Sequence, residues 1–253
     1  MTSYLITGCS RGLGLSMVET LASMPKSEVG TIFATSRSES AALKDLASKH
    51  NDRVVTVLLD VLSLDSINAA VTTVEGKLNG KGLDVLINNA GIMGTAPGGA
   101  PAMKDLESHF EMNVLAPHRI TVAFLPLLKA GNLKKIANIT TTLGSITQVR
   151  KYTWGSSPAY KVTKAALNML TAQYAIDLES EGFTVFCVSP GWLKTDLGGV
   201  EYADLSVEVG AKATLDKIIG ATAKDNGGFL NILVKGWEKT DGPNQYDGLN
   251  PPW

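Results

Sequence analysis

Short apolar runs rich in β-branched residues recur along the chain, and stretches with helical spacing separate them. Leu13, Met17 and Leu21 share one helical face, and Leu43 and Leu46 mark another helix. The apolar runs predict seven strands: Tyr4–Ile6, Thr31–Thr35, Val54–Leu59, Val85–Ile87, Ile136–Ile139, Thr184–Val188 and Phe229–Leu233. Strands that alternate with helices favour a parallel sheet. The pattern therefore predicts an α/β fold, a doubly wound parallel seven-stranded sheet with helices on both faces.

Two segments interrupt this alternation. Met93–Pro101 is rich in glycine and proline, so we expect a loop there. Lys235–Trp253 is rich in glycine, proline, asparagine and aromatic residues, so we expect a tail with little regular structure. In an open α/β sheet, ligands bind outside the carboxyl ends of the strands. Functional residues are therefore expected in the loops that follow the strands.

Composition narrows the class of protein. The chain has 253 residues, 44% of them hydrophobic, and a net charge of −1, which suits one α/β domain and gives no basic face for nucleic acid or membranes. No basic leader or membrane-length apolar run is seen, so we predict a cytoplasmic protein. Cys9 and Cys187 make no disulfide framework, and a reducing compartment suits them. His50, His109 and His118 lack metal-ligand spacing, so no metal site is predicted.

A glycine-rich turn follows the first strand. Gly8 permits a tight turn, Gly12 lets the backbone approach a phosphate, and Gly14 lets the next helix pack close to the strand. The N-terminus of that helix presents N–H groups to a pyrophosphate. The strand-turn-helix context favours a Rossmann-like dinucleotide site, with a plain connecting turn as the alternative.

The residues after the second and third strands indicate which dinucleotide binds. Arg37 stands where a carboxylate would select NAD by binding the ribose hydroxyls, and a guanidinium there would attract a 2′-phosphate. Arg11 could assist from the glycine turn, unless both arginines are simply solvated. Asp60 could accept a hydrogen bond from adenine, or else cap the helix around Ser63. These residues favour NADP(H) as the cofactor.

Tyr160 and Lys164 open an apolar helix at a spacing that places them on one face. A nearby ammonium favours the phenolate, so we expect Lys164 to lower the pKa of Tyr160 and to tune it as an acid–base group. A Tyr-x-x-x-Lys pair alone is usually structural, so the catalytic interpretation of this pair depends on the other motifs in the sequence.

Those motifs occur in a familiar order. Thr7–Gly14, Asn88–Gly91, Asn113, Tyr160 with Lys164, and Pro190–Gly191 together resemble the short-chain dehydrogenase/reductase family over nearly the whole chain. Further stretches resemble its sniffer and C-factor-like carbonyl reductases: Gly8–Leu15, Leu143–Ile146, Ala165–Asn168, Pro190–Asp196 and Asn226–Phe229. The resemblance implies one NADP-binding domain over residues 1–253, with residues 1–92 mainly binding cofactor and 93–253 carrying the catalytic residues, substrate loops and tail.

The resemblance also implies roles for individual residues. The cofactor-binding residues it implies are Gly8, Ser10, Arg11, Gly12, Leu13, Gly14, Arg37, Asp60, Val61, Asn89, Ala90, Gly91, Tyr160, Lys164, Pro190, Gly191, Leu193 and Thr195. The last two would reach the nicotinamide carboxamide, through the Leu193 backbone and the Thr195 hydroxyl.

The implied catalytic residues are Asn113, Thr141, Tyr160 and Lys164. Asn113 would hold a water that links the lysine to solvent, and Tyr160 would be the general acid. Thr141 departs from the family, which has serine there; threonine keeps the hydroxyl but adds a methyl that crowds the site. Thr141 and Tyr160 also lie unusually far apart along the chain.

The residues inserted between them, Gln148–Ser157, are expected to form a pocket wall. The predicted substrate residues are Met93, Tyr152, Trp154 and Trp192, with Gly94 nearby and Trp237 or Trp253 as further candidates. Loop aromatics suit an apolar or aromatic carbonyl compound.

The sequence thus predicts an NADPH-dependent carbonyl reductase, an NADP-dependent oxidoreductase that moves hydride to a ketone or aldehyde. Two alternatives stay open: a non-redox dehydration, epimerisation or cyclisation at the same site, and a dinucleotide-sensing binding protein. No nucleic acid or membrane partner is expected. A homodimer or homotetramer is expected through the helices that contain Asn113 and Tyr160, although Leu167–Ala175 could equally be core.

Overall fold

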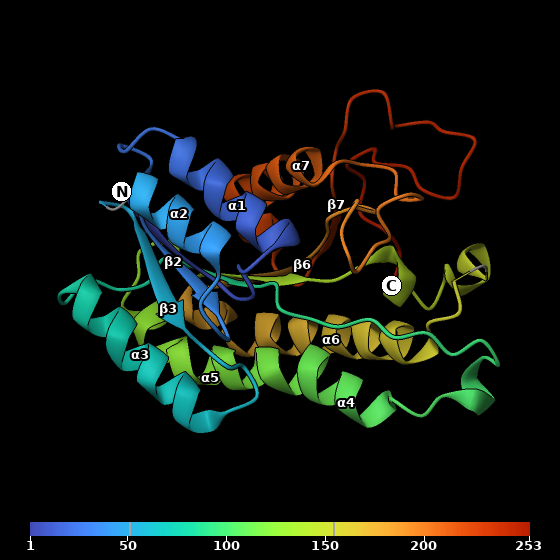
Figure 1. Ribbon diagram of the computed structural model, residues 1–253, viewed down its shortest axis with the longest axis horizontal. Helices are drawn as coiled ribbons and strands as arrows, with labels where there is room; N and C mark the ends of the chain where they lie inside the picture. The colour runs from blue at the N-terminus through green and yellow to red at the C-terminus, as the bar shows by residue number, and fades with distance from the viewer. Residues whose placement is uncertain (51, 154) are drawn as a thin grey trace.

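The fold is a seven-stranded parallel sheet between two layers of helices (Figure 1). The computed structural model describes residues 1–50, 52–153 and 155–253. The strands are β1 (Thr2–Ile6), β2 (Val29–Ser36), β3 (Val54–Leu58), β4 (Val85–Asn88), β5 (Lys135–Ile139), β6 (Thr184–Ser189) and β7 (Phe229–Asn231). Their spatial order is β3-β2-β1-β4-β5-β6-β7, and the strand order reverses direction between β1 and β4. This confirms the predicted Rossmann-like doubly wound sheet.

Helices cover both faces of this sheet (Figure 1). They are α1 (Gly12–Ser23), α2 (Ala41–Lys49), α3 (Leu64–Leu78), α4 (Leu106–Phe110), α5 (Ala116–Lys129), α6 (Pro158–Asp177) and α7 (Val207–Gly220). Helices α1, α2 and α7 lie on one face, and α3, α5 and α6 on the other. Side chains of β4 alternate between the two cores: Val85 and Ile87 face the first, and Leu86 faces the second. The central strands are therefore buried on both sides, which is why they appear as continuous apolar runs.

The two irregular segments also match the prediction. The loop that begins at Met93 contains only a short 3₁₀ turn, Ala100–Ala102, before Met103. The tail after β7 forms no helix or strand among the described residues. It folds back on the sheet instead, because Asp247 pairs with Leu233 in an isolated antiparallel bridge. Strand β7 accordingly ends before Leu233, earlier than predicted.

Candidate active site

A cavity of about 800 Å³ opens at the carboxyl ends of the strands. All the cofactor residues proposed from the sequence line it, from the glycine turn to the Pro190–Thr195 loop. Thr141, Tyr160 and Lys164 line it as well, but Asn113 does not. The place matches the rule for open α/β sheets, since the order of the strands reverses between the neighbouring strands β1 and β4.

The glycine turn leaves room for a ligand and none for side chains. Gly8 has a φ of 74°, a left-handed conformation that glycine adopts at no cost. A Cβ on Gly14 would lie 2.3 Å from the Gly8 carbonyl oxygen, so α1 packs directly against the turn. Arg11, the N-cap of α1, makes no side-chain capping hydrogen bond. The first amides of α1 therefore face the cavity without a side-chain cap, an arrangement that fits a pyrophosphate.

Arg37, Arg11 and Asp60, which the sequence suggests as cofactor-selecting residues, all line the cavity but differ in their contacts. Arg37 is exposed and lines the cavity at the end of β2. Arg11 instead pairs with Asp196, Nε to Oδ2 at 3.2 Å, although both side chains stay largely exposed. Asp60 lines the cavity and accepts a hydrogen bond from the Leu62 amide at 3.0 Å. Helix α3 is capped by Ser63 itself, so Asp60 is not its cap.

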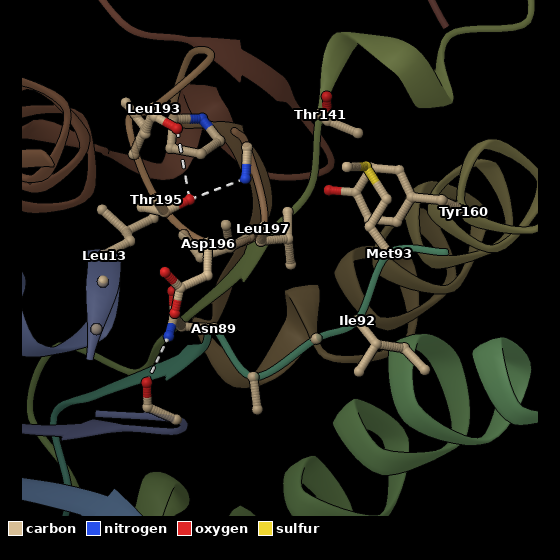
Figure 2. Close-up of a pocket in the computed structure, with 18 of the residues that line it drawn as sticks. Leu13, Asn89, Ile92, Met93, Thr141, Tyr160, Leu193, Thr195, Asp196 and Leu197 are labelled. Carbon is tan, nitrogen blue, oxygen red and sulfur yellow. Dashed lines mark hydrogen bonds between the residues drawn. The ribbon is translucent and has the colours of Figure 1, made fainter. Parts of the chain in front are cut away.

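At the other end of the cavity lie the hydroxyl groups of Thr141 and Tyr160 (Figure 2). Thr141 directly follows β5 and Thr140, and its hydroxyl accepts a hydrogen bond from the Leu143 amide at 3.2 Å. Lys164 lies one helical turn after Tyr160 on α6, and its Nζ is 5.6 Å from the Tyr160 ring centroid. That ammonium donates a hydrogen bond to the Ile139 carbonyl at 2.8 Å, so β5 fixes the lysine.

One electrostatic prediction, a lowered pKa for Tyr160, is wrong. Burial raises the pKa of Tyr160 above its usual value, and Lys164 does not offset that effect. Burial also lowers the pKa of Lys164 to about 8. Both groups are nearly inaccessible to water, and desolvation disfavours their charged forms. Tyr160 is therefore held as a neutral phenol, the form that can donate a proton.

Asn113 sits in a π-helical turn, Glu111–Leu115, between α4 and α5. Its side chain is fully buried and grips the backbone of Ile92: Oδ1 accepts from the Ile92 amide at 2.9 Å, and Nδ2 donates to the Ile92 carbonyl at 3.0 Å. The family resemblance implied a role in holding water. That role stays a prediction, and the structure shows in addition that the Asn113 side chain anchors the segment after β4.

The loop after β6 forms the wall opposite Tyr160. The Thr195 hydroxyl accepts a hydrogen bond from the Gly198 amide at 3.0 Å, and the Trp192 indole donates to the Gly198 carbonyl at 2.6 Å. Leu193 packs into the core beneath the loop. These bonds shape the Pro190–Gly198 loop, and they place Leu193 and Thr195 on the cavity as the sequence predicts.

The predicted substrate residues are only partly confirmed in position. Met93, Tyr152 and Trp192 line the cavity, whereas Trp154 lies outside the described residues. Gly94 contacts α4 rather than the cavity. The two tail tryptophans are also elsewhere: Trp253 stacks on Phe229 at a centroid distance of 5.3 Å, and Trp237 packs on Tyr246 at 5.7 Å.

The tail contributes two residues that the sequence pattern did not reveal. Tyr246 and Asn244 line the cavity. The Tyr246 hydroxyl donates to Asp204 at 2.5 Å and accepts from the Trp192 amide at 3.0 Å, while Asn244 Nδ2 donates to Asp204 at 2.8 Å. Burial and the Asp204 carboxylate both raise the pKa of Tyr246. The tail is thus pinned to the Trp192 loop.

The sheet order, the uncapped glycine turn and the cleft above it define a dinucleotide-binding enzyme of the Rossmann type. The short-chain dehydrogenase family model matches residues 3–205, and the chain belongs to the short-chain dehydrogenase/reductase family of oxidoreductases. Enzymes of this family use a nicotinamide dinucleotide.

Relatives cover nearly the whole chain. The short-chain dehydrogenase anuI of Penicillium roqueforti is 32% identical over 92% of this chain and 96% of its own length. An NADPH-bound carbonyl reductase from chicken fatty liver superposes with a TM-score of 0.86 at 33% identity, covering 100% of this chain and 99% of that one. The carbonyl reductase Sniffer of D. melanogaster gives a TM-score of 0.87 at 32% identity, covering 100% of both chains.

No helix in the described ranges is long and apolar enough to cross a membrane. No group of three or more histidine, cysteine or acidic side chains in those ranges could hold a metal ion.

Proposed function

We propose that this protein is an NADPH-dependent carbonyl reductase. The observation that carries the proposal is a single cavity that joins the glycine turn and Arg37 at one end to Thr141, Tyr160 and Lys164 at the other. When bound, NADPH would supply a hydride from its nicotinamide ring to the carbonyl carbon. Residues 1–92 mainly hold the cofactor, and residues 93–253 supply the catalytic groups, the substrate loops and the tail.

The choice of NADPH over NADH rests on Arg37. The guanidinium lies at the end of β2 beside the cavity, where it would form charge-assisted hydrogen bonds to a 2′-phosphate. The carbonyl reductase from chicken fatty liver, which this chain resembles, holds NADPH in its crystal structure. Arg11 would have to leave Asp196 to join Arg37 at the phosphate.

The protein's own groups would handle the carbonyl oxygen. Tyr160 is a neutral phenol at physiological pH, since the ordinary tyrosine pKa is about 10 and burial raises the pKa of Tyr160 further, so it can donate a hydrogen bond and then a proton. The Thr141 hydroxyl would donate the second hydrogen bond to the developing alkoxide. The substrate end is largely apolar, with Ile92, Met93 and Leu143 among its walls, so a bulky apolar or aromatic ketone fits best.

The Thr141 hydroxyl can be tested by paired variants. Thr141→Val keeps the shape and removes the hydroxyl, so kcat/KM should fall about 100-fold, as for the loss of one oxyanion donor. Thr141→Ser keeps the hydroxyl and should retain or exceed wild-type turnover. The measurement is steady-state kinetics with one ketone, and equal rates for all three proteins would remove Thr141 from the mechanism.

Lys164 would hold the nicotinamide ribose through its ammonium group, and this role predicts a pH dependence. Its pKa is lowered to about 8 by burial, so the ammonium is present below that pH and is lost above it. Because kcat/KM reports groups of the free enzyme, it should decline as the pH rises through about 8. In Lys164→Arg the guanidinium keeps its charge, so the decline should disappear. A wild-type kcat/KM that stays constant to about pH 10 would contradict this role for Lys164.

A panel assay tests the function itself. Purified protein is mixed with NADPH, or with NADH in parallel, and with aliphatic ketones, aromatic ketones and quinones. Oxidation of NADPH that is much faster than oxidation of NADH supports the proposal. Tight NADPH binding without oxidation of any kind would move the assignment to a non-redox reaction or to a dinucleotide sensor.

A further inference from the structure

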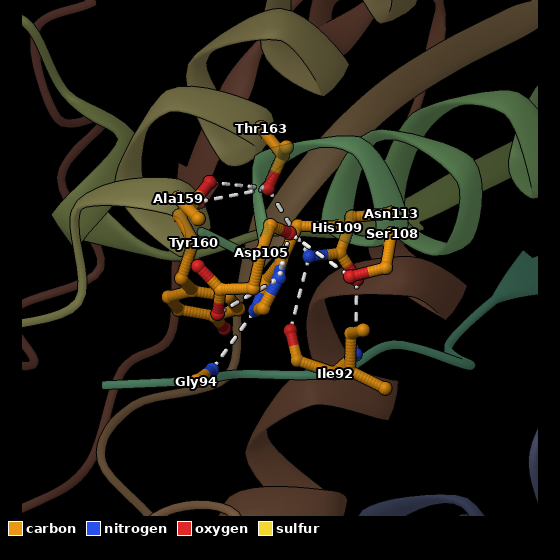
Figure 3. Close-up of polar contacts among 9 residues, drawn as sticks. All are labelled: Ile92, Gly94, Asp105, Ser108, His109, Asn113, Ala159, Tyr160 and Thr163. Carbon is orange, nitrogen blue, oxygen red and sulfur yellow. Dashed lines mark hydrogen bonds and ion pairs between the residues drawn. The ribbon is translucent and has the colours of Figure 1, made fainter. Parts of the chain in front are cut away.

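Residues 92–94 lie along one wall of the cavity, and two side chains of the helical segment 106–115 bind the backbone of this stretch on the side away from the cavity. Residues 92–94 run beside α4 and the π-helical turn (Figure 3). Asn113 grips Ile92 through two hydrogen bonds, and His109 Nε2 accepts one from the Gly94 amide at 2.8 Å. Asn113 and His109 stand one turn apart on one face. Met93 lies between the two anchored residues and lines the cavity.

The contacts of His109 define its protonation state. The Gly94 amide can only donate, so Nε2 must carry a lone pair. Nδ1 lies 2.8 Å from the Asp105 carbonyl oxygen and 3.3 Å from the Asp105 carboxylate, and both are acceptors that favour a proton on Nδ1. Only the neutral Nδ1–H tautomer satisfies both sides of the ring.

The segment fits closely against this imidazole. The His109 side chain is 4% exposed. A Cβ on Gly94 would lie 2.3 Å from Asp105 Oδ2 and 3.0 Å from His109 Cε1, so only glycine allows the backbone so near. Without His109, the partly buried Gly94 amide would lose its acceptor, and an unsatisfied donor of this kind is costly. The backbone would then shift to find another partner.

The same cluster reaches the helix that carries Tyr160. Asn113 Nδ2 also donates to the Thr163 hydroxyl at 3.1 Å, and the single proton of that hydroxyl is shared between the carbonyls of Ala159 at 2.9 Å and Tyr160 at 3.0 Å, both on α6 (Figure 3). Met93 and Tyr160 stand at the same end of the cavity (Figure 2). One hydrogen-bonded network, centred on Asn113, therefore holds both the Met93 wall and the first turn of the helix that carries Tyr160.

We propose that His109 is a positioning residue that sets the Met93 wall through the Gly94 amide, and thereby the binding of the apolar group of a carbonyl substrate. This inference rests on the proposed reductase function. His109 does not line the cavity, so it would act on the substrate only through Gly94 and Met93. Its effect should therefore appear in KM for the ketone and in discrimination between ketones of different bulk, while the binding of NADPH stays unchanged.

The test compares His109→Leu, His109→Gln and the control His118→Gln. His118 is exposed on α5, where it bonds to the Tyr174 hydroxyl away from the cavity. Leucine removes the acceptor, so KM for a bulky ketone should rise about tenfold, the fold-change of one lost buried hydrogen bond, with kcat and the NADPH Kd near wild type. Glutamine offers Oε1 to the Gly94 amide and should restore most of the KM. His118→Gln should match the wild type.

Equal KM values for the wild type and both His109 variants would overturn the proposal. So would a His109→Leu defect that glutamine does not restore at all. Should the variants fail to fold, imidazole nitrogen spectra of histidine-labelled wild-type protein decide the point, with His109 assigned by elimination using His50→Gln and His118→Gln. The Nδ1–H tautomer supports the proposal, and an Nε2–H tautomer or an imidazolium at neutral pH overturns it. A wild type that reduces no carbonyl would instead defeat the reductase function, and the tautomer spectrum would still be readable.

Discussion

Tyr160→Phe should lower kcat for ketone reduction about 1,000-fold, while NADPH still binds with near wild-type affinity. The variant removes one oxygen from a buried ring and leaves the packing of α6 intact. It deletes the only proton donor that the mechanism assigns to the developing alkoxide. Single-turnover kinetics and cofactor fluorescence, measured on the same samples, separate the loss of chemistry from any loss of binding.

Tyr152→Phe is the matched control for this prediction. Tyr152 is also buried and also lines the cavity, but it lies in the inserted segment and is assigned no proton transfer. Its loss should alter KM more than kcat. Near-normal turnover by Tyr160→Phe, or an equal loss of kcat in both variants, would show that Tyr160 is not the proton donor.

Arg37→Asp should reverse the cofactor preference. A carboxylate at the end of β2 would repel a 2′-phosphate and could bind the two ribose hydroxyls of NADH. Loss of the charge-assisted hydrogen bonds and the added repulsion should raise KM for NADPH about 100-fold, while KM for NADH falls. The ratio of kcat/KM for the two cofactors is the measurement. Because Arg37 is exposed, the change should leave the thermal midpoint nearly unchanged.

Arg11→Ala gives a comparison on the opposite side of the cavity mouth. Arg11 pairs with Asp196, so its loss should weaken NADPH binding less than the loss of Arg37 does. If Arg37→Asp leaves the preference for NADPH untouched, the phosphate is bound elsewhere. A larger effect from Arg11 would place the 2′-phosphate at the glycine turn.

The fold was predictable because each strand and helix leaves its own hydrophobic pattern in a short stretch of sequence. Strands β1, β2, β4, β5 and β6 are mostly buried on both faces and so appear as continuous apolar runs between helical patterns, whereas β3 lies at the sheet edge and exposes Leu58. The end of β7 was not predictable, because Leu233 pairs with Asp247 of the tail. The hydrophobic pattern around Leu233 does not reveal a contact with a residue so far along the chain. Strand ends such as Ser189, which joins Asn231, likewise depend on the neighbouring strand.

The cofactor end of the site was more predictable than the substrate end. The glycine turn lies within one short strand-turn-helix unit, so its geometry follows from sequence order. Tyr246 and Asp204 are 42 residues apart, and only the folded tail brings them together at Trp192. The ionisation of Tyr160 was missed for a similar reason, since the burial that governs it comes from the whole fold. The four-residue spacing along the sequence showed that Tyr160 and Lys164 share a helical face, but it did not show that the fold buries both side chains away from water.

Transfer of deuterium tests the central claim most directly. NADPH that carries deuterium at both C4 positions of the nicotinamide is incubated with the wild type and the best ketone from the panel, and the alcohol is examined by mass spectrometry. The account predicts one deuterium on the former carbonyl carbon and one molecule of NADP formed per alcohol, with both products formed about 1,000-fold more slowly in Tyr160→Phe. An unlabelled product, or conversion of the ketone without consumption of NADPH, would contradict hydride transfer and with it the reductase function.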